Sequence, residues 1–451
     1  MKRHPRLALC TTLAAAALAI SARAEAPHVY AITGARIVTA AGAPIPTGTV
    51  VIRNGLIESV SAGGTAPADA VPIDGAGLTI YPGLIDMGTA TGLDINASPR
   101  APENFRTTEE AERWKRSVIF RPDQLAANHL KADAAELARL ASTGVTSVLA
   151  TPPGVLLKGQ SALVNVVAPP DEPQIGAVAD PRGGIQVVRT PVALHIEFAR
   201  NPRGDGYPDS LLGAIAFVRQ SFLDARHQRI VARRYEKAGG ARPNYDPALD
   251  ALQPALDGQL PVAFEANEAR EIMRALAMAQ EFKLNPVVTG AREADQVAGD
   301  LKSRHANVIF NLHFPTRPRT LDPDEDEPVR TLRSRANTPK VPAALDKAGV
   351  LFAFSSAGVR EPRDFLRHAA RTVKEGLPAD AAIRALTINA ARIAGAAERL
   401  GSIEKGKIAN VIVTEGDLFD EKMRLKHVFV DGRLVAIDET SQQDRRGRSD
   451  Q

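Results

Sequence analysis

Hydrophobic and polar residues follow two different patterns along the chain, and each predicts a different part of the fold. Near both ends, apolar and polar residues alternate, and turn dipeptides split these runs at Asn54-Gly55 and Asp431-Gly432. An Asn-Gly or Asp-Gly pair between two alternating runs is a strong hairpin signal. Neither short segment can bury much apolar surface alone, so we expect the two ends to meet in one small β-domain.

In the middle of the chain, apolar runs alternate with helical patterns, which indicates a mostly parallel sheet with helices between its strands. The helical patterns cover residues 206–227, 268–282 and 381–395, and a polar, acidic stretch at 320–340 predicts a surface loop. The predicted strands, besides one ending near Asp86, are residues 144–151, 191–198, 261–267, 285–290, 306–314 and 349–356. These units suit a distorted (β/α)8 TIM barrel of the α/β class.

The N-terminus has the pattern of an export signal. Four basic or polar residues precede an apolar stretch at 7–20, and small residues follow at the expected cleavage point. The stretch is shorter than the ~20 apolar residues that a membrane span needs. We therefore expect a cleaved signal peptide at 1–24 and a periplasmic or secreted protein with no membrane span. The single cysteine, Cys10, leaves with the signal.

Signal cleavage also changes the charge. Removing residues 1–24 takes away four basic residues and no acidic one, so Lys plus Arg falls from 56 to 52 and equals the 52 Asp plus Glu. No basic stripe remains that would favour nucleic acid as a partner. The expected order is a signal peptide at 1–24, the first part of the β-domain at 25–80, the barrel at 81–400, the second part of the β-domain at 401–438 and a disordered tail at 439–451.

Several motifs, taken in order, resemble those of a known family. They are the alternating opening followed by YPGLIDMG at 81–88, the run LTINAARIAG at 386–395, the element GSIEKGK at 401–407, and HVFVDGRLV at 427–435. This order resembles the amidohydrolase superfamily, and within it the imidazolonepropionase-like branch. The resemblance implies a distorted TIM barrel with a composite β-domain, and metal-assisted hydrolysis of C–N bonds in linear or cyclic amides, with zinc or another divalent metal.

The chain departs from that family at the expected metal ligands. The two histidines after the first strand correspond to Gly88 and Ala90, the sixth-strand histidine to Gly290, and the eighth-strand aspartate to Ala357. Each lost ligand costs about two orders of magnitude in metal affinity when a four-ligand zinc site is divided evenly. We therefore expect no cofactor. The fourth-strand lysine or glutamate of the family cannot be placed.

Other residues could form a rearranged site. Glu265 stands in the fifth-strand position, with Asn267 two residues later. His195 and His313 each lie in a predicted strand beside a polar residue at i±2, Glu197 and Asn311, so each pair faces one side of the sheet. A histidine hydrogen-bonded inside the core is the alternative for both.

Three further residues are candidates for lining a pocket. Ser355 and Ser356 end a predicted strand, and they are either nucleophiles or pocket residues. Arg219, on the helix predicted at 206–227, is either a pocket residue or part of a helix packed on the barrel.

Two functions follow from these patterns. The first is an exported, catalytically impaired amidohydrolase homologue that acts in binding or assembly, as a homo-oligomer or with an active related chain. The second is an active hydrolase of small amides, lactams or dipeptide-like substrates that uses Glu265, His195, His313 and Ser355. A periplasmic solute-binding role for a small amide-type ligand is a third alternative.

Overall fold

The computed structural model describes residues 29–97, 99–131, 134–166, 185–199, 207–318, 320–322, 324–435 and 437. The predicted signal peptide and the predicted tail at 439–451 lie outside these residues. Within the described part of the chain, no helix has both the length and the apolar character to cross a membrane.

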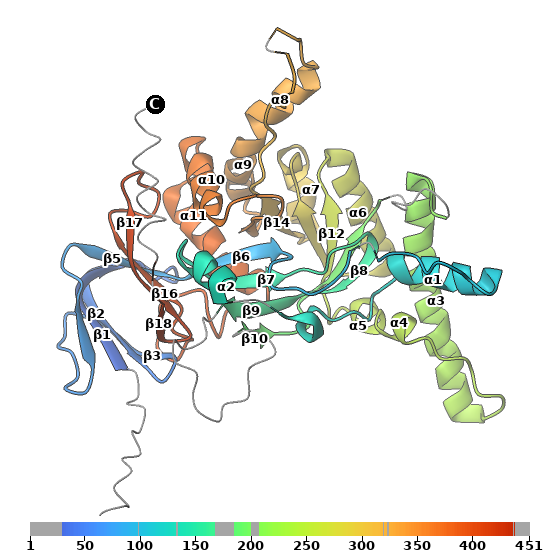
Figure 1. Ribbon diagram of the computed structural model, residues 1–451, viewed down its shortest axis with the longest axis horizontal. Coiled ribbons are helices and arrows are strands. Elements are labelled where there is room, and N and C mark those ends of the chain that lie inside the picture. Colours follow the sequence, from blue (N-terminus) through green and yellow to red (C-terminus); the bar gives the residue numbers. More distant parts are fainter. Residues whose placement is uncertain are drawn as a thin grey trace, which may run out of the picture.

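The two ends of the chain form one sheet of eight strands (Figure 1). Its order is β18-β17-β16-β5-β1-β2-β3, and β4 pairs with β1. The antiparallel pair of β5 and β16 joins the two ends of the chain, as the hairpin signals predict. The strands are β1 (Val29–Ile37), β2 (Ile45–Arg53), β3 (Leu56–Ala62), β4 (Val71–Asp74), β5 (Leu78–Pro82), β16 (Val411–Glu415), β17 (Arg424–Val430) and β18 (Arg433–Val435).

The two predicted hairpin turns adopt the left-handed backbone that their residues favour. The φ angles are 51° at Asn54, 81° at Gly55, 53° at Asp431 and 73° at Gly432, as a two-residue turn of type I′ requires. The two turns also touch, because a Cβ at Gly432 would lie 2.5 Å from the Gly55 Cα. Glycine at this point lets the ends of the chain meet backbone to backbone.

The central part of the chain is TIM-barrel-like, with its strands in two sheets of order β10-β9-β7-β6 and β15-β14-β13-β12-β11-β8. Strands β11 to β15 are parallel, as predicted, whereas β8, β9 and β10 pair antiparallel with neighbours and were not predicted. The strands are β6 (Leu84–Thr89), β7 (Val145–Ala150), β8 (Leu156–Gln160), β9 (Ala162–Val166), β10 (Ile185–Arg189), β11 (Leu194–Glu197), β12 (Val262–Ala266), β13 (Pro286–Gly290), β14 (Asn307–Asn311) and β15 (Phe352–Ser355).

Helices cover the outside of these strands (Figure 1). On α6, for example, Ile272 and Leu276 belong to the same buried cluster as Val288 and Phe310 of the strands. The helices are α1 (Thr108–Ile119), α2 (Ala134–Ala141), α3 (Leu211–Ala238), α4 (Pro247–Asp250), α5 (Gln253–Leu256), α6 (Ala269–Phe282), α7 (Ala298–Ser303), α8 (Val329–Asn337), α9 (Val341–Ala348), α10 (Pro362–Lys374), α11 (Ala379–Leu386) and α12 (Ile388–Ile393).

Two helix predictions were wrong in detail. The helix expected at 381–395 is divided into α11 and α12, because Thr387 has φ −134° and ψ −96° and interrupts the helical backbone. The loop expected at 320–340 contains α8, which has no buried residue and therefore shows no apolar periodicity. The helix α6 begins with a capping box of Glu268 and Glu271, close to the start that its pattern predicts.

Candidate functional site

A cavity of about 360 Å³ lies at the carboxyl ends of the barrel strands, which is the face where TIM-barrel sites are built. Residues from β6, β7, β8, β11, β12, β13, β14 and β15 and from the loops beside them line it. The polar and charged residues at its wall are Asp86, Thr89, Thr91, Thr151, Lys158, His195, Glu265, Thr289, Asn311, Ser355, Ser356, Arg360 and Glu361.

On one side of the cavity, Asp86 of β6 connects to the end of β15. Its Oδ1 accepts hydrogen bonds from the backbone N–H of Ser356 at 2.8 Å and of Gly88 at 3.2 Å. Its Oδ2 accepts a hydrogen bond from the Ser356 hydroxyl. The Ser355 hydroxyl donates to the Gly88 carbonyl at 3.0 Å. We call Asp86, Gly88, Ser355 and Ser356 the seam group, because they join the two strands across the junction of the sheets.

Asp86 is 3% exposed, and this burial raises the pKa of its carboxyl to about 6. Burial penalises the charged form, and the hydrogen bonds from Ser356 and Gly88 offset only part of that penalty. Asp86 therefore changes its protonation state near neutral pH while facing the cavity.

On the other side of the cavity, a lysine lies between two carboxylates. Lys158 of β8 places its Nζ 2.8 Å from Glu197 Oε2 and 2.6 Å from Glu265 Oε2. Strands β11 and β12 bring the two glutamates together, since Glu197 is the register partner of Glu265. We call these three residues the ion-pair group.

The ion-pair group keeps its lysine charged. Burial alone would lower the pKa of Lys158, but the charges of Glu265 and Glu197 outweigh it and raise that pKa. The pKa of Glu197 is also raised, mainly because burial disfavours its charge and in spite of the nearby lysine. Lys158 has three N–H donors, more than its two glutamate contacts use, and it lines the cavity.

His195 lies deep in the cavity wall and is neutral. One ring nitrogen is 2.8 Å from the Ser161 Oγ, and burial, helped by the charge of Lys158, lowers the pKa of His195 to about 3. Ser161 is fully buried and is not among the residues that line the cavity. This arrangement matches the alternative of a histidine hydrogen-bonded inside the core, although His195 also lines the cavity.

The remaining predicted site residues are divided between the cavity and its surroundings. Asn311 lines the cavity, and its Oδ1 accepts a hydrogen bond from the backbone N–H of His313 at 2.8 Å. The His313 side chain is exposed. Asn267 lies behind Gly290 and does not line the cavity. Arg219 does not reach it either, because its guanidinium pairs with Glu281 on α6 at 2.9 Å.

Comparisons with known proteins agree with this architecture. A family model described as the amidohydrolase family matches residues 300–435. The amidohydrolase tasK of Hapsidospora irregularis is 24% identical over 411 residues, which cover 85% of this chain and 39% of that protein. The chain thus spans about two fifths of the length of that relative.

These two matches support assigning the chain to the amidohydrolase superfamily, which its motifs resemble.

Solved structures show the same fold. An amidohydrolase from Thermotoga maritima MSB8 superposes with a TM-score of 0.72 at 23% identity, covering 91% of this chain and 100% of the other. A prolidase complexed with N-methylphosphonate-L-proline gives a TM-score of 0.51 at 19% identity, with 91% and 100% of the two chains covered. These likenesses concern the fold of the barrel and its additional β-domain.

At the positions where the family pattern has metal ligands, this chain leaves little room for larger side chains. A Cβ at Gly88 would lie 2.7 Å from the Ser355 Oγ, and a Cβ at Gly290, where φ is +87°, would lie 2.7 Å from the Asn267 Oδ1. Any histidine there requires neighbours to move. Ala90 and Ala357 line the cavity without a donor atom. Among the described residues, no three His, Cys, Asp or Glu form a group that could hold a metal ion.

The expectation that this protein takes no cofactor is nevertheless wrong. Members of the amidohydrolase family, whose model matches residues 300–435, normally use a divalent metal. The poor fit of the described side chains shows which residues do not hold such a metal. It carries no conclusion about whether the protein binds one.

Two residues of the site were not predicted. Lys158 follows an apolar run that looks like any buried strand, and its partners are 39 and 107 positions away, so no local pattern marks it. Asp86 marks the end of a predicted strand, but its contact with Ser356 spans 270 positions. Glu197 lies at the end of β11, opposite Glu265 of β12, and the sequence named it only as the polar neighbour of His195.

Proposed function

We propose that this amidohydrolase homologue binds a small amide-type ligand in the cavity at the carboxyl ends of its strands, and that its hydrolysis of C–N bonds is impaired. Family membership supports a protein of the C–N hydrolase class. The ion-pair group carries the proposal of impairment: the Lys158 ammonium lies within 2.8 Å of both Glu197 and Glu265.

The impairment follows from what a general base must do. A base needs a carboxylate that is free to accept a proton from water. The Lys158 ammonium holds one oxygen of each glutamate, Glu197 Oε2 and Glu265 Oε2, so neither carboxylate is free to take up a proton from water. The buried Asp86 is likewise occupied by three hydrogen bonds from Ser356 and Gly88.

The same groups suit ligand binding. An amide presents a carbonyl acceptor and an N–H donor, and the cavity wall offers the Lys158 ammonium as a donor and the partly exposed Glu265 carboxylate as an acceptor. Ser355, Ser356 and Asn311 supply neutral polar atoms across the cavity. A pocket with few, fixed polar groups is typical of small-molecule sites.

Thermal unfolding with added ligands tests binding. The probes are hydantoin, a γ-lactam and an Xaa-Pro dipeptide, the last chosen because an Xaa-Pro dipeptidase is among the structural neighbours. A ligand at ~100 times its dissociation constant stabilises the folded state by about 2.7 kcal/mol. We expect one of these classes to raise the melting temperature of the wild type, and to lose at least ~10-fold in affinity for Glu265→Gln. No stabilisation by any class contradicts the proposal.

A second function, hydrolysis by a rearranged site, is favoured by one contact. The Ser356 hydroxyl donates to Asp86, whose pKa of about 6 suits a proton acceptor, and both residues line the cavity. In this function Asp86 takes the hydroxyl proton as Ser356 Oγ bonds to the amide carbon. The amine leaves with that proton, and water then hydrolyses the ester and restores Ser356.

A fluorophosphonate probe and intact-protein mass separate the two functions. The binding function predicts no covalent adduct on the wild type. A stoichiometric adduct that Ser356→Ala removes, together with amide turnover, would replace the first proposal by the second. Ser355→Ala is the matched control, because Ser355 lies next in the chain and donates to the Gly88 carbonyl instead of to Asp86.

We also propose that the protein is exported after cleavage near residue 24, on the strength of the basic start and short apolar stretch of the sequence. The mass of the protein recovered from the periplasm of its host tests this. A mature N-terminus close to Ala24 or Ala26 supports export, and an intact Met1 in the cytoplasm contradicts it.

A further inference from the structure

Helix α3 extends beyond the body of the molecule. Its first part packs on the barrel through buried residues such as Val218 and Phe222. Its last part does not: every residue from Arg233 to the end of the helix at Ala238 is exposed. In Figure 1 this end of α3 projects at the lower right, past α4 and α5. An exposed helix end of this length gains no stability from packing on its own chain.

One face of the projecting helix is both apolar and basic. Leu223, His227, Ile230, Arg234 and Lys237 follow a spacing of four and three residues, so they lie along one face, and all five are exposed. Leu223 and Ile230 are 43% and 64% exposed. We call these five residues the arm stripe.

The cations of the arm stripe differ from others on the same helix. Arg219 pairs with Glu281, and Arg229 pairs with Asp257 at 2.5 Å, so both fasten α3 to the body. No described acidic side chain forms an ion pair with Arg234 or Lys237. The arm stripe is therefore a face whose apolar and charged groups both lack partners within the described chain.

A second projection of the same chain has the opposite charge. It carries exposed Asp324, Glu325 and Asp326 before α8, and exposed Val329 and Leu332 on α8, at 60% and 46%. We call these five residues the acidic finger. The nine-residue helix α8 has no buried residue, so its apolar side chains are not used in packing.

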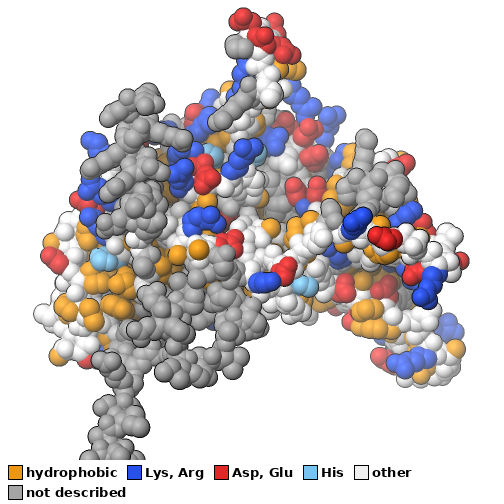
Figure 2. All heavy atoms as spheres, viewed as in Figure 1, with side chains coloured by type: hydrophobic (Ala, Val, Ile, Leu, Met, Phe, Trp, Pro, Cys, Tyr) orange, Lys and Arg blue, Asp and Glu red, His pale blue; other side chains and the backbone are white. Residues whose placement is uncertain are grey.

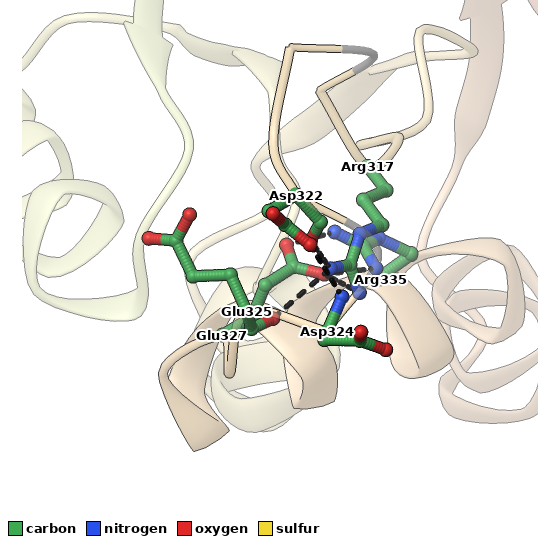
Figure 3. Close-up of polar contacts among 6 residues, drawn as sticks. All are labelled: Arg317, Asp322, Asp324, Glu325, Glu327 and Arg335. Atoms are coloured by element: carbon green, nitrogen blue, oxygen red, sulfur yellow. Dashed lines mark hydrogen bonds and ion pairs between the residues drawn. The ribbon is translucent and has the colours of Figure 1, made fainter.

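The acidic finger is held in shape from within, and no described cation forms an ion pair with the carboxylates of Asp324, Glu325 or Asp326. Arg317 donates from Nη2 to the backbone carbonyls of Asp322 at 2.7 Å and Glu325 at 2.9 Å, and Glu327 pairs with Arg335 at 2.5 Å (Figure 3). In Figure 3 the carboxylates of Asp324 and Glu325 point away from this cluster. The internal arginines thus use Glu327 and backbone oxygens, not the outer acids.

The two projections lie at different ends of the molecule and cannot meet within one chain. Figure 2 shows acidic side chains gathered at the upper tip, and basic with apolar side chains at the lower right end. We propose that they bind each other between two copies of this chain, with the acidic finger of one copy on the arm stripe of the next.

A second copy is favoured over other partners because both halves of the interface are present on one chain. In the proposed contact, the acidic residues of the finger face the basic residues of the arm stripe. Val329 and Leu332 offer apolar surface to Leu223 and Ile230. Complementary charges steer encounter, and the apolar pairs exclude water. Because the two surfaces differ, the contact is heterologous and builds a closed ring or an open chain of copies.

Light scattering on the full chain, combined with charge reversal, tests this. We expect an average mass above one chain at about 0.05 M salt that falls toward one chain at about 1 M, where charges are screened within ~3 Å. The arm variant Arg234→Glu with Lys237→Glu, and the finger variant Asp324→Lys with Glu325→Lys, should each weaken self-association at least ~10-fold.

Mixing the two reversed variants is the decisive step. An equimolar mixture regains a charge-complementary contact, so association should return in the mixture although neither variant associates alone. The matched control, Lys347→Glu with Lys405→Glu, changes the net charge as much as the arm variant does, at exposed residues away from both projections, and should behave like the wild type.

Three results would overturn the proposal: a wild-type mass of one chain at concentrations up to ~100 μM, association that the arm variant leaves unchanged, or folded reversed variants whose mixture stays dissociated. Circular dichroism of each variant establishes folding. Ligand binding in the barrel cavity plays no part in the readout, so this test and the test of the proposed function fail separately.

Discussion

The two sides of the barrel mouth provide partners for their carboxylates in different ways. The seam group gives Asp86 two backbone N–H groups and a hydroxyl, all neutral. The ion-pair group gives Glu197 and Glu265 one shared ammonium. As a result the pKa of Asp86 is raised to about 6 on one side of the cavity, and the pKa of Lys158 is raised on the other.

Carboxylates can therefore be present at a barrel mouth and still be unable to act as catalytic bases, because other groups of the protein already bind them. Neutral donors leave the charge of Asp86 uncompensated, so its protonation follows the pH. An ammonium compensates charge directly, so the ion-pair group keeps a fixed cation in the wall of the cavity. Substitutions on the two sides should accordingly differ in the size and the pH dependence of their effects.

Lys158→Met should have the largest effect on stability. It leaves Glu197 and Glu265 facing each other without a cation, and losing one partner of a buried ion pair costs several kcal/mol. The partial exposure of Glu265 reduces that cost, so we expect a loss of roughly 2–4 kcal/mol in urea unfolding at pH 7. Adding Glu197→Gln and Glu265→Gln should restore most of it. A loss below ~0.5 kcal/mol would mean that solvent already satisfies the two acids.

Asp86→Asn should change how stability depends on pH. The folded pKa of Asp86 is about 6 and its ordinary value is 3.8, so the folded state holds the proton more tightly. Its contribution to stability is complete below 3.8 and is lost as pH rises through about 6. From pH 4 to pH 7 the wild type should therefore lose about 2–3 kcal/mol relative to Asp86→Asn.

The unfolding free energy of the wild type must be compared with that of Asp86→Asn, because His195 also changes stability with pH. Its lowered pKa of about 3 destabilises the fold as pH falls below its ordinary 6.5, which opposes the trend from Asp86. Both proteins carry His195, so subtracting their unfolding free energies removes its effect. Parallel curves across pH 4–7 would show that Asp86 is not buried as described.

Gly88→Ala should have the smallest effect and should depend on Ser355. The new Cβ would lie 2.7 Å from the Ser355 Oγ, so we expect a cost of about 1–2 kcal/mol. Ser355→Ala removes that oxygen, and the double variant should cost less than the sum of the single ones. Additive costs in this double-mutant cycle would contradict the close packing of the seam group.

The sequence predicts those parts of the fold that depend on neighbours along the chain. Asn54-Gly55 and Asp431-Gly432 carry their own turn geometry, and the apolar strands of the barrel carry their own periodicity. The break at Thr387 and the helix α8 were missed, because one depends on tertiary packing and the other lies on the surface without an apolar face.

The site was predicted only in part for the same reason. Glu265, His195, Asn311, Ser355 and Ser356 follow from their place in strands, and they do line the cavity. What each one touches depends on residues far away in the sequence. Lys158 in particular looks like one polar position of a buried strand until β11 and β12 place two glutamates beside it.

Turnover of amides with added metal is the sharpest test of the proposed impairment. The purified chain is incubated with hydantoin, a γ-lactam and an Xaa-Pro dipeptide, with and without Zn²⁺ or Mn²⁺. We predict product formation at the protein-free background under every condition, while at least one of these compounds stabilises the fold. Turnover stimulated by a metal and abolished by Glu265→Gln would show that the ion pair with Lys158 does not disable this carboxylate, and the proposed impairment would be wrong.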